Sequence, residues 1–370
     1  MNTHLRAAAT LGDDAIELRA VKRTVQEPRL WVSREALPAT FRERLLAAGA
    51  TIEDGECGST RIAPPTSSSG VTFWTSADPL AGDLLGAAWA GSEHGDARFA
   101  EQHGSVTPIL MGILNATPDS FSDGGAHATA AAAIARGHVL VAEGATWIDV
   151  GGESTRPGAS EVSANDEIER VVPVIEALAA AGARISIDTR KASVASAALA
   201  AGATLVNDVS GGLFDPQILQ VAAHANAMYC AMHMRGTPGT MQQQTDYGDT
   251  VLDVVQALRL RARAAVDAGI SPERLWLDPG IGFAKKLEHN LAILRELDVL
   301  ACLGFPLLVG VSRKKMIGEL SGVVAPRERV AGSLAGLALA VAGGAHILRV
   351  HDVRESREAL AVAAAISGRA

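Results

Sequence analysis

From residue 108 to the end of the chain, short apolar runs rich in Val, Ile and Leu alternate with amphipathic, alanine-rich stretches. The short runs have the length of buried strands, and the longer stretches have the periodicity of helices. The expected strands are Ile109–Leu114, Thr146–Val150, Arg184–Ile187, Thr204–Val206, Ala227–Met232, Leu275–Leu277, Pro306–Val309 and Ile347–Val350. Helices are expected near residues 127–143, 165–181, 191–201, 214–225, 248–268, 287–298, 327–342 and 354–367.

Eight strand–helix units in about 260 residues favour a closed parallel barrel over an open doubly wound sheet. No G-x-G-x-x-G sequence follows the first strand, so a dinucleotide-binding sheet lacks its main support. We therefore expect an α/β protein with a (β/α)8 TIM barrel over residues 106–370 and a small extra α+β region over residues 1–105.

The first 105 residues differ in composition from the rest. Residues 61–70 read RIAPPTSSSG, which is typical of a linker or loop. Arg34–Ala50 and Pro79–Ala90 have helical patterns, and Val71–Thr75 has the pattern of a strand. This region is small α+β or partly irregular and carries no motif that indicates chemistry. A separate binding function for it stays open.

Polar side chains follow every expected strand at its carboxyl end, where barrel enzymes build their active sites. They are Asn115; Asp149 with Gly151–Pro157; Asp188–Arg190; Asn207 and Asp208; His233; Asp278–Gly280 with Gly282 and Phe283; Ser312–Lys315; and Arg349, His351 and Asp352. The first strand leads into the polar loop ATPDSFSDGG, which is either functional or an ordinary connection to the next helix. The repetition at all eight strands favours an active site.

Half of these side chains suit phosphate chemistry. Four of them supply positive charge or directed donors for phosphate or pyrophosphate oxygens: Arg156, Lys314, Arg349 and His351. Asn115, with Asp149 or Asp188 nearby, offers the hard oxygen ligands that Mg²⁺ prefers. The alternative for Arg349 and His351 is a surface salt bridge with Asp352.

The other half suits a polar ring. Asp188, Asn207 and Asp278 can recognise a ring that carries an amino group next to a ring N–H, because a carboxylate accepts two parallel hydrogen bonds from such an edge. The alternative is that Asp188 and Asp208 cap the helices that follow them.

Composition narrows the class of protein. With 48% hydrophobic and 20% charged residues the chain can bury a sizeable core, and its net charge of −8 with 4% aromatics argues against nucleic-acid binding. Cys57, Cys230 and Cys302 form neither a zinc pattern nor a disulfide framework, and no signal pattern opens the chain. We expect a cytoplasmic protein. The uncharged run Val330–Leu348 divides into a helix, a turn and a strand, so no membrane span is expected.

Eight segments in order, over residues 108 to about 355, resemble dihydropteroate synthase of the folate pathway. They are NATPDSFSD from Asn115, GGESTRPGA from Gly151, SIDT from Ser186, NDVSGG from Asn207, MHMRGTPGTMQ from Met232, LDPGIGFAKKLEHN from Leu277, GVSRKK from Gly310 and RVHDV from Arg349. The first, second and sixth segments are long and specific. The resemblance does not extend to the first hundred residues.

The resemblance implies condensation of para-aminobenzoate with 6-hydroxymethyl-7,8-dihydropterin pyrophosphate, with Mg²⁺ as cofactor. It implies that the pterin is held by Asp188, Asn207, Asp278 and Lys314, with Met232 against the ring. It implies that Asn115, Arg349 and His351 bind pyrophosphate, and that Asn115 contacts Mg²⁺. The implied para-aminobenzoate pocket consists of Thr155, Arg156, Pro157, Phe283 and Ser312, closed by loops that include Ser120, Phe121 and Asp123.

Two departures from the family pattern are small: Ala284 stands where glycine is usual, and Ala116 where valine is frequent. Phe283 and Pro157 match sulfonamide-sensitive members, so inhibition by sulfonamides is expected. A homodimer is also implied, with the helices at 327–342 and 354–367 as one possible face, although these helices could simply pack on the barrel. Competing interpretations are a pterin-dependent methyltransferase that uses methyltetrahydrofolate and a corrinoid partner, and a non-catalytic pterin-binding paralogue or partner subunit.

Overall fold

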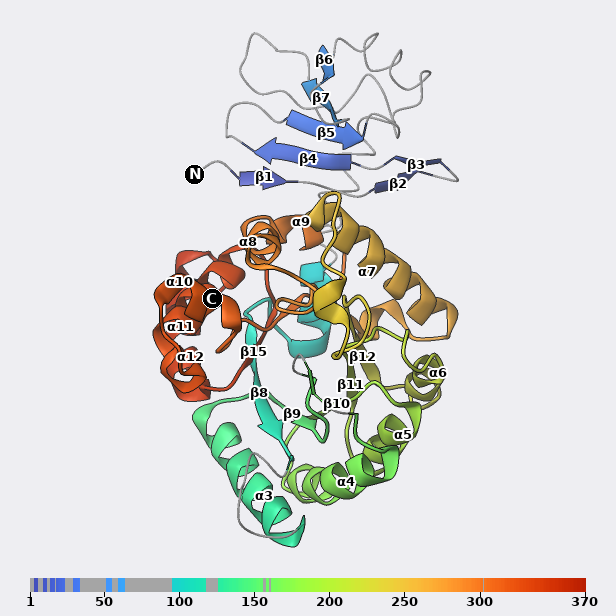
Figure 1. Ribbon diagram of the computed structural model, residues 1–370, viewed down its shortest axis with the longest axis vertical. Coiled ribbons are helices and arrows are strands. Elements are labelled where there is room, and N and C mark those ends of the chain that lie inside the picture. The colour runs from blue at the N-terminus through green and yellow to red at the C-terminus, as the bar shows by residue number, and fades with distance from the viewer. Residues whose placement is uncertain are drawn as a thin grey trace. The chain divides into compact units, whose positions relative to one another are not determined.

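The computed structural model describes residues 95–117, 126–155, 158–159, 161–301 and 303–370, together with seven strands in the first 63 residues (Figure 1). The chain divides into two compact units. One comprises residues 1–98 and 295–305, and the other comprises residues 99–294 and 306–370. The expected division at residues 105 and 106 stays a prediction.

The second unit is the expected parallel barrel. Its strands are β8 (Ile109–Asn115), β9 (Trp147–Gly151), β10 (Ile185–Asp188), β11 (Leu205–Asp208), β12 (Met228–Met232), β13 (Leu275–Asp278), β14 (Leu308–Val309) and β15 (Ile347–Val350). Their order is β13-β12-β11-β10-β9-β8-β15-β14, with every pairing parallel. A parallel bridge between Leu277 and Leu307 joins the two ends of this sheet. The strands are apolar runs because both faces are buried.

Helices α3 to α7 and α10 to α12 lie around the outside of these strands (Figure 1). The helices are α3 (Ala126–Glu143), α4 (Ala164–Ala180), α5 (Ala192–Ala200), α6 (Gln217–His224), α7 (Thr250–Asp267), α8 (Leu287–Arg295), α9 (Leu297–Ala301), α10 (Lys315–Ser321), α11 (Val330–Ala342) and α12 (Val353–Ile366). Each of the eight helices expected from residue 127 onward is present. The short helix α10 was not expected, and the segment expected as one helix near 287–298 consists of α8 and α9.

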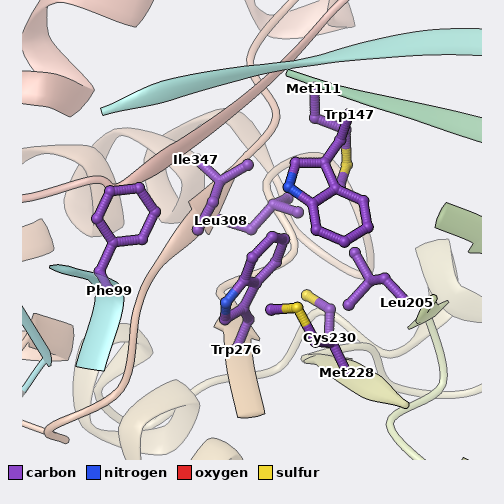
Figure 2. Packing of buried hydrophobic residues seen from close by; sticks show 9 residues of the cluster. All are labelled: Phe99, Met111, Trp147, Leu205, Met228, Cys230, Trp276, Leu308 and Ile347. Carbon is purple, nitrogen blue, oxygen red and sulfur yellow. The ribbon is translucent and has the colours of Figure 1, made fainter. Parts of the chain in front are cut away.

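Large side chains fill the amino-terminal end of the barrel. Phe99 comes from the helical segment before β8, and the others come from the first three residues of strands; Figure 2 shows their packing: Phe99, Met111, Trp147, Leu205, Met228, Cys230, Trp276, Leu308 and Ile347. The indole rings of Trp147 and Trp276 meet edge to face, with centroids 5.7 Å apart. Trp276 Nε1 donates to Gln102 Oε1 at 2.7 Å, so residues 99–103 of the preceding helix are tied to this core.

The uncharged run Val330–Leu348 forms α11, a turn and β15, as expected. Over the described part of the chain, no helix is both long and apolar enough to cross a membrane. Cys230 is a buried free thiol, whereas Cys57 and Cys302 lie outside the described residues.

The first unit contains antiparallel strands. A five-stranded sheet has the order β1-β4-β5-β7-β6, and β2 pairs with β3. The strands are β1 (Thr3–Leu5), β2 (Ala9–Leu11), β3 (Asp14–Ile16), β4 (Leu18–Arg23), β5 (Arg29–Ser33), β6 (Thr51–Asp54) and β7 (Ser59–Ala63). The helices expected at Arg34–Ala50 and Pro79–Ala90 and the strand expected at Val71–Thr75 lie outside the described residues.

Candidate active site

Strand register brings the expected polar residues side by side at the carboxyl end of the barrel. Asp188, the last residue of β10, is paired with Asn207 on one side and with Gly151 on the other. Met232 and Asp278, the last residues of β12 and β13, are paired with each other. Asn115 ends β8 opposite Gly151. The side chains that the sequence placed at one face are therefore neighbours in space.

Asp149 lies at the centre of a buried hydrogen-bond network. Its Oδ1 accepts from Ser186 Oγ at 2.6 Å. Its Oδ2 accepts from Asn207 Nδ2 at 3.0 Å and from Arg349 Nε at 2.6 Å. Both carboxylate oxygens are thus engaged, and Asp149 orients Asn207 and Arg349.

Asp188 has one engaged oxygen and one without a partner. Its Oδ2 accepts from Arg349 Nη2 at 2.6 Å, whereas its buried Oδ1 has no hydrogen-bond partner among the described residues. Burial, with repulsion from Asp149, raises the pKa of Asp188 to about 7, although Arg349 opposes the shift. A buried acceptor without a donor costs about 1–3 kcal/mol, so this oxygen is suited to receive an N–H from a ligand.

Asp278 and Lys314 form the opposite side of the candidate site. Asp278 Oδ1 accepts from Gly280 N at 2.7 Å, and burial raises the pKa of this carboxyl. Burial lowers the pKa of Lys314 to about 8, while the Asp278 carboxylate favours its charged form. Lys314 Nζ lies 4.4 Å from the centroid of the Phe283 ring, a cation–π arrangement that places the ammonium beside an aromatic wall.

Ser312 and His351 are also in contact. Ser312 Oγ lies 3.1 Å from His351 Nδ1 and accepts from His351 N at 3.2 Å. The alternative interpretation that Arg349 forms a surface salt bridge with Asp352 was wrong, because Arg349 binds two buried carboxylates and Arg313 Nε binds Asp352 at 3.0 Å.

The alternative interpretation that Asp208 caps the following helix was wrong, because α6 begins at Gln217 after Pro216, and Asp208 instead caps the turn that follows β11. Its Oδ1 accepts from Ser210 N and its Oδ2 accepts from Gly212 N, each at 2.7 Å. The same interpretation was also wrong for Asp188, because α5 begins after Lys191 and its capping position has no side-chain hydrogen bond.

A buried ion network holds the two ends of the loop after β9. Glu153 Oε1 accepts from Val162 N at 2.9 Å, and Lys191 Nζ donates to Val162 O at 2.8 Å. Arg190 pairs with Glu153 at 3.1 Å, and Lys191 pairs with Glu167 at 2.6 Å. Thr155 in this loop is half-buried. Five other expected site residues lie outside the described residues: Ser120, Phe121, Asp123, Arg156 and Pro157.

Lys285 was not predicted as a site residue. It is buried behind the loop that carries Phe283, and its Nζ contacts His233 Nδ1 at 2.9 Å. The available signal was a pair of lysines directly after a glycine-rich loop, a pattern that does not distinguish the buried lysine from the exposed Lys286.

A divalent cation would find hard oxygen ligands at this end of the barrel. Over the described residues, no group of three or more His, Cys, Asp or Glu side chains is arranged to hold a metal. The amide oxygen of Asn115, at the end of β8, nevertheless fits Mg²⁺, which keeps several waters and takes its other ligands from substrate phosphates.

The comparisons with known proteins agree on one family. Residues 111–351 match the model of the pterin binding enzyme family. Dihydropteroate synthase from a Synechocystis strain is 50% identical over 258 residues, which cover 70% of this chain and 89% of that protein. The chain belongs to the dihydropteroate synthase family of pterin-binding enzymes. This membership confirms the resemblance seen in the motifs, and with it the expectation of a transferase of folate biosynthesis.

Solved dihydropteroate synthases share the barrel. The Xanthomonas albilineans enzyme with 4-aminobenzoic acid has a TM-score of 0.66 and 47% identity, over 70% of this chain and 93% of that one. The Yersinia pestis enzyme with a sulfonamide drug has a TM-score of 0.67 and 46% identity, over 71% of this chain and 95% of that one. These matches confirm the TIM-barrel expectation.

Proposed function

We propose that this protein condenses 6-hydroxymethyl-7,8-dihydropterin pyrophosphate with para-aminobenzoate to give 7,8-dihydropteroate and pyrophosphate. The observation that carries the proposal is the buried, unpartnered Oδ1 of Asp188 beside Asn207, with Asp278 at the end of β13 at the same end of the barrel. Such a set of acceptors, flanked by cations, suits an amino-bearing ring attached to a pyrophosphate. Family membership and the 4-aminobenzoic acid complex of a relative support it.

The pterin is bound at the ends of β10 to β13. Asp188 and Asp278 accept from its amino group and ring N–H groups, and Asn207 satisfies mixed donors and acceptors. Lys314 donates from the opposite side. The buried Met232 packs against the ring. These four polar side chains define which face of the pterin lies toward the para-aminobenzoate pocket.

Departure of pyrophosphate is the hard step, because negative charge accumulates on the leaving group. A guanidinium has five N–H donors, and Arg349 gives one to Asp149 and one to Asp188, so three remain for phosphate oxygens. His351 adds a donor held by Ser312. Asn115 contributes a hydrogen bond and would hold Mg²⁺, which supplies further neutralisation of the pyrophosphate charge when bound.

The amine of para-aminobenzoate is neutral at pH 7 and requires no strong general base. It is placed by Phe283, Ser312 and Thr155, together with Arg156 and Pro157. The loop residues Ser120, Phe121 and Asp123 exclude water, which would otherwise attack the same carbon. The negative charge of Asp188 stabilises the positive charge that develops on the pterin methylene.

The test is pyrophosphate release by purified protein with the pterin pyrophosphate, Mg²⁺ and para-aminobenzoate, each omitted in turn. Release that requires all three, with dihydropteroate as product, supports the proposal, and competition between a sulfonamide and para-aminobenzoate would extend it. Pterin binding without release would instead indicate a non-catalytic paralogue. Methyl transfer from methyltetrahydrofolate to a corrinoid protein would indicate the methyltransferase.

A homodimer and a cytoplasmic location belong to the same proposal. Helices α11 and α12 pack side by side, and Leu339, Val362 and Ile366 are exposed on them. A second copy of the chain would cover these apolar side chains. Leu339→Glu is expected to shift sedimentation toward the monomer, whereas Val324→Glu, which changes a more exposed apolar residue outside both helices, is not.

A further inference from the structure

Lys285 is a buried lysine whose three N–H donors are all engaged. The side chain is 4% exposed. Its Nζ donates to Gly280 O at 3.0 Å and to Phe283 O at 3.0 Å, and it contacts His233 Nδ1 at 2.9 Å. None of the ion pairs of the described residues includes it. The ammonium therefore binds backbone carbonyls and a ring nitrogen in place of a carboxylate.

Burial of an ammonium without a carboxylate in contact is unfavourable. Burial lowers the pKa of Lys285 to about 7, although the more distant Asp278 opposes the shift. Burial, with repulsion from Lys285, also keeps the pKa of His233 well below its usual value, so the imidazole is neutral and can accept. An apolar side chain would fill the same space without this cost. The buried lysine therefore indicates a role other than stabilising the fold.

The three acceptors lie on two neighbouring loops that carry site residues. His233 directly follows Met232 at the end of β12, and Gly280 to Phe283 directly follow Asp278 at the end of β13. Gly280 also donates its N–H to Asp278 Oδ1. Any movement of the Gly280 backbone therefore changes the environment of Asp278.

The loop after β13 passes through the left-handed region at three residues. Gly280 and Gly282, with φ of 67° and 84°, adopt this region without strain, whereas Ala284, with φ of 48°, is held in a conformation unfavourable for alanine. Conformations of this kind persist where surrounding contacts determine them. Lys285 binds two carbonyls of this loop, and Tyr247 Oη donates to a third, Ala284 O, at 2.9 Å. These contacts hold the Phe283 ring beside Lys314 Nζ.

We propose that Lys285 is a positioning residue, which fixes the loop after β13 against His233 so that Asp278 meets the pterin and Phe283 meets para-aminobenzoate. The inference rests on the proposed function. It assigns Lys285 no contact with substrate. Its effect is transmitted through the carbonyls of Gly280 and Phe283.

The test compares Lys285→Met with Lys286→Met, which changes the neighbouring exposed lysine and serves as the control. Lys285→Met is expected to raise the KM of both substrates at least tenfold in the folded enzyme, with far-UV circular dichroism unchanged. Lys286→Met is expected to match the wild type. Lys285→Gln, which keeps two N–H donors without the charge, is expected to recover part of the affinity.

A purely structural lysine would give a different result. Loss of folded protein would lower the maximal rate and leave KM unchanged. KM values of Lys285→Met and Lys285→Gln equal to those of the wild type would therefore overturn the inference. If Lys285→Met does not fold, the KM of Lys285→Gln decides alone. Absence of turnover in the wild type and in Lys286→Met would contradict the proposed function itself, so the two failures are distinguishable.

Discussion

Arg349 Nη2 donates to Asp188 Oδ2 at 2.6 Å, across the interior of the barrel mouth from β15 to β10. The same guanidinium binds Asp149, so one cation holds two buried carboxylates, and it opposes the rise that burial and repulsion from Asp149 cause in the pKa of Asp188. The two carboxylates in turn raise the pKa of Arg349, which stays charged. The contact between Arg349 and Asp188 therefore serves two purposes. It holds the guanidinium proposed to bind pyrophosphate, and it orients the carboxylate proposed to bind the pterin.

Replacement of Arg349 by lysine tests this contact. A lysine has one ammonium and cannot span both carboxylates, so the pKa of Asp188 is expected to rise and kcat to fall about 100-fold, as for loss of a transition-state donor. The measurement is kcat against pH with both substrates saturating. An acid limb at the wild-type pH in Arg349→Lys would contradict the account of Asp188.

The pH profile of kcat/KM for the pterin substrate is expected to be bell-shaped. Asp188 must be ionised to accept hydrogen bonds, so activity falls below its pKa of about 7. Lys314 must be charged, so activity falls above its pKa of about 8. Each limb approaches about tenfold per pH unit. Lys314→Arg should displace the alkaline limb and leave the acid limb in place, and a flat profile from pH 6 to 9 would contradict both assignments.

Stability is expected to depend on pH through Lys285. Its pKa in the folded protein is lowered from 10.5 to about 7, so between these values the unfolded chain binds more protons. The free energy of unfolding therefore rises with pH across this window, by at most about 1.4 kcal/mol per pH unit for one proton. Urea unfolding of wild type and Lys285→Met at pH 7 and pH 9 measures this term as their difference. If the free energy of unfolding of the wild type does not rise from pH 7 to pH 9 relative to that of Lys285→Met, Lys285 titrates normally.

Gly280→Ala is expected to disrupt the loop after β13. A Cβ at this position would lie 2.0 Å from His233 O, and φ is 67°. The backbone must shift, at an expected cost of about 3 kcal/mol or more in the free energy of unfolding. Gly248→Ala is the matched control, because nothing lies within 4 Å of its Cβ. Equal denaturant midpoints for the two variants would contradict this account.

Ala284→Gly is expected to change stability little, although alanine is the family exception here. Ala284 has φ of 48°, and relief of this conformation favours glycine by about 1–2 kcal/mol. The lost methyl burial costs about 0.8 kcal/mol and the added freedom of the unfolded chain about 0.4–1 kcal/mol. The terms nearly cancel, so urea unfolding should show a change of at most about 1 kcal/mol. A loss of twice this size would show that burial of the methyl in the cluster that includes Met232 and Met241 dominates.

The pattern of apolar and polar residues along the sequence was sufficient to predict most of the strands and helices of the barrel. All eight strands lie within two residues of their expected bounds, because a parallel strand buried on both faces is a continuous apolar run. Polar residues directly after those runs indicated the candidate site, because carboxyl ends of parallel strands meet at one face. Helix α10 was missed because seven residues that include Gly318 are too few to show a period.

Only the tertiary structure decided which polar groups meet. Arg349 and Asp149 are 200 residues apart, and they meet because β15 pairs with β8 when the barrel closes. Sequence proximity had favoured Asp352 as the partner of Arg349, but Arg349 pairs with Asp149 and Asp188, and Asp352 pairs with Arg313. Lys285 and Lys286 are adjacent and chemically identical, but one is buried on three acceptors and the other is exposed. Burial and partner choice depend on packing between distant elements, which no local pattern contains.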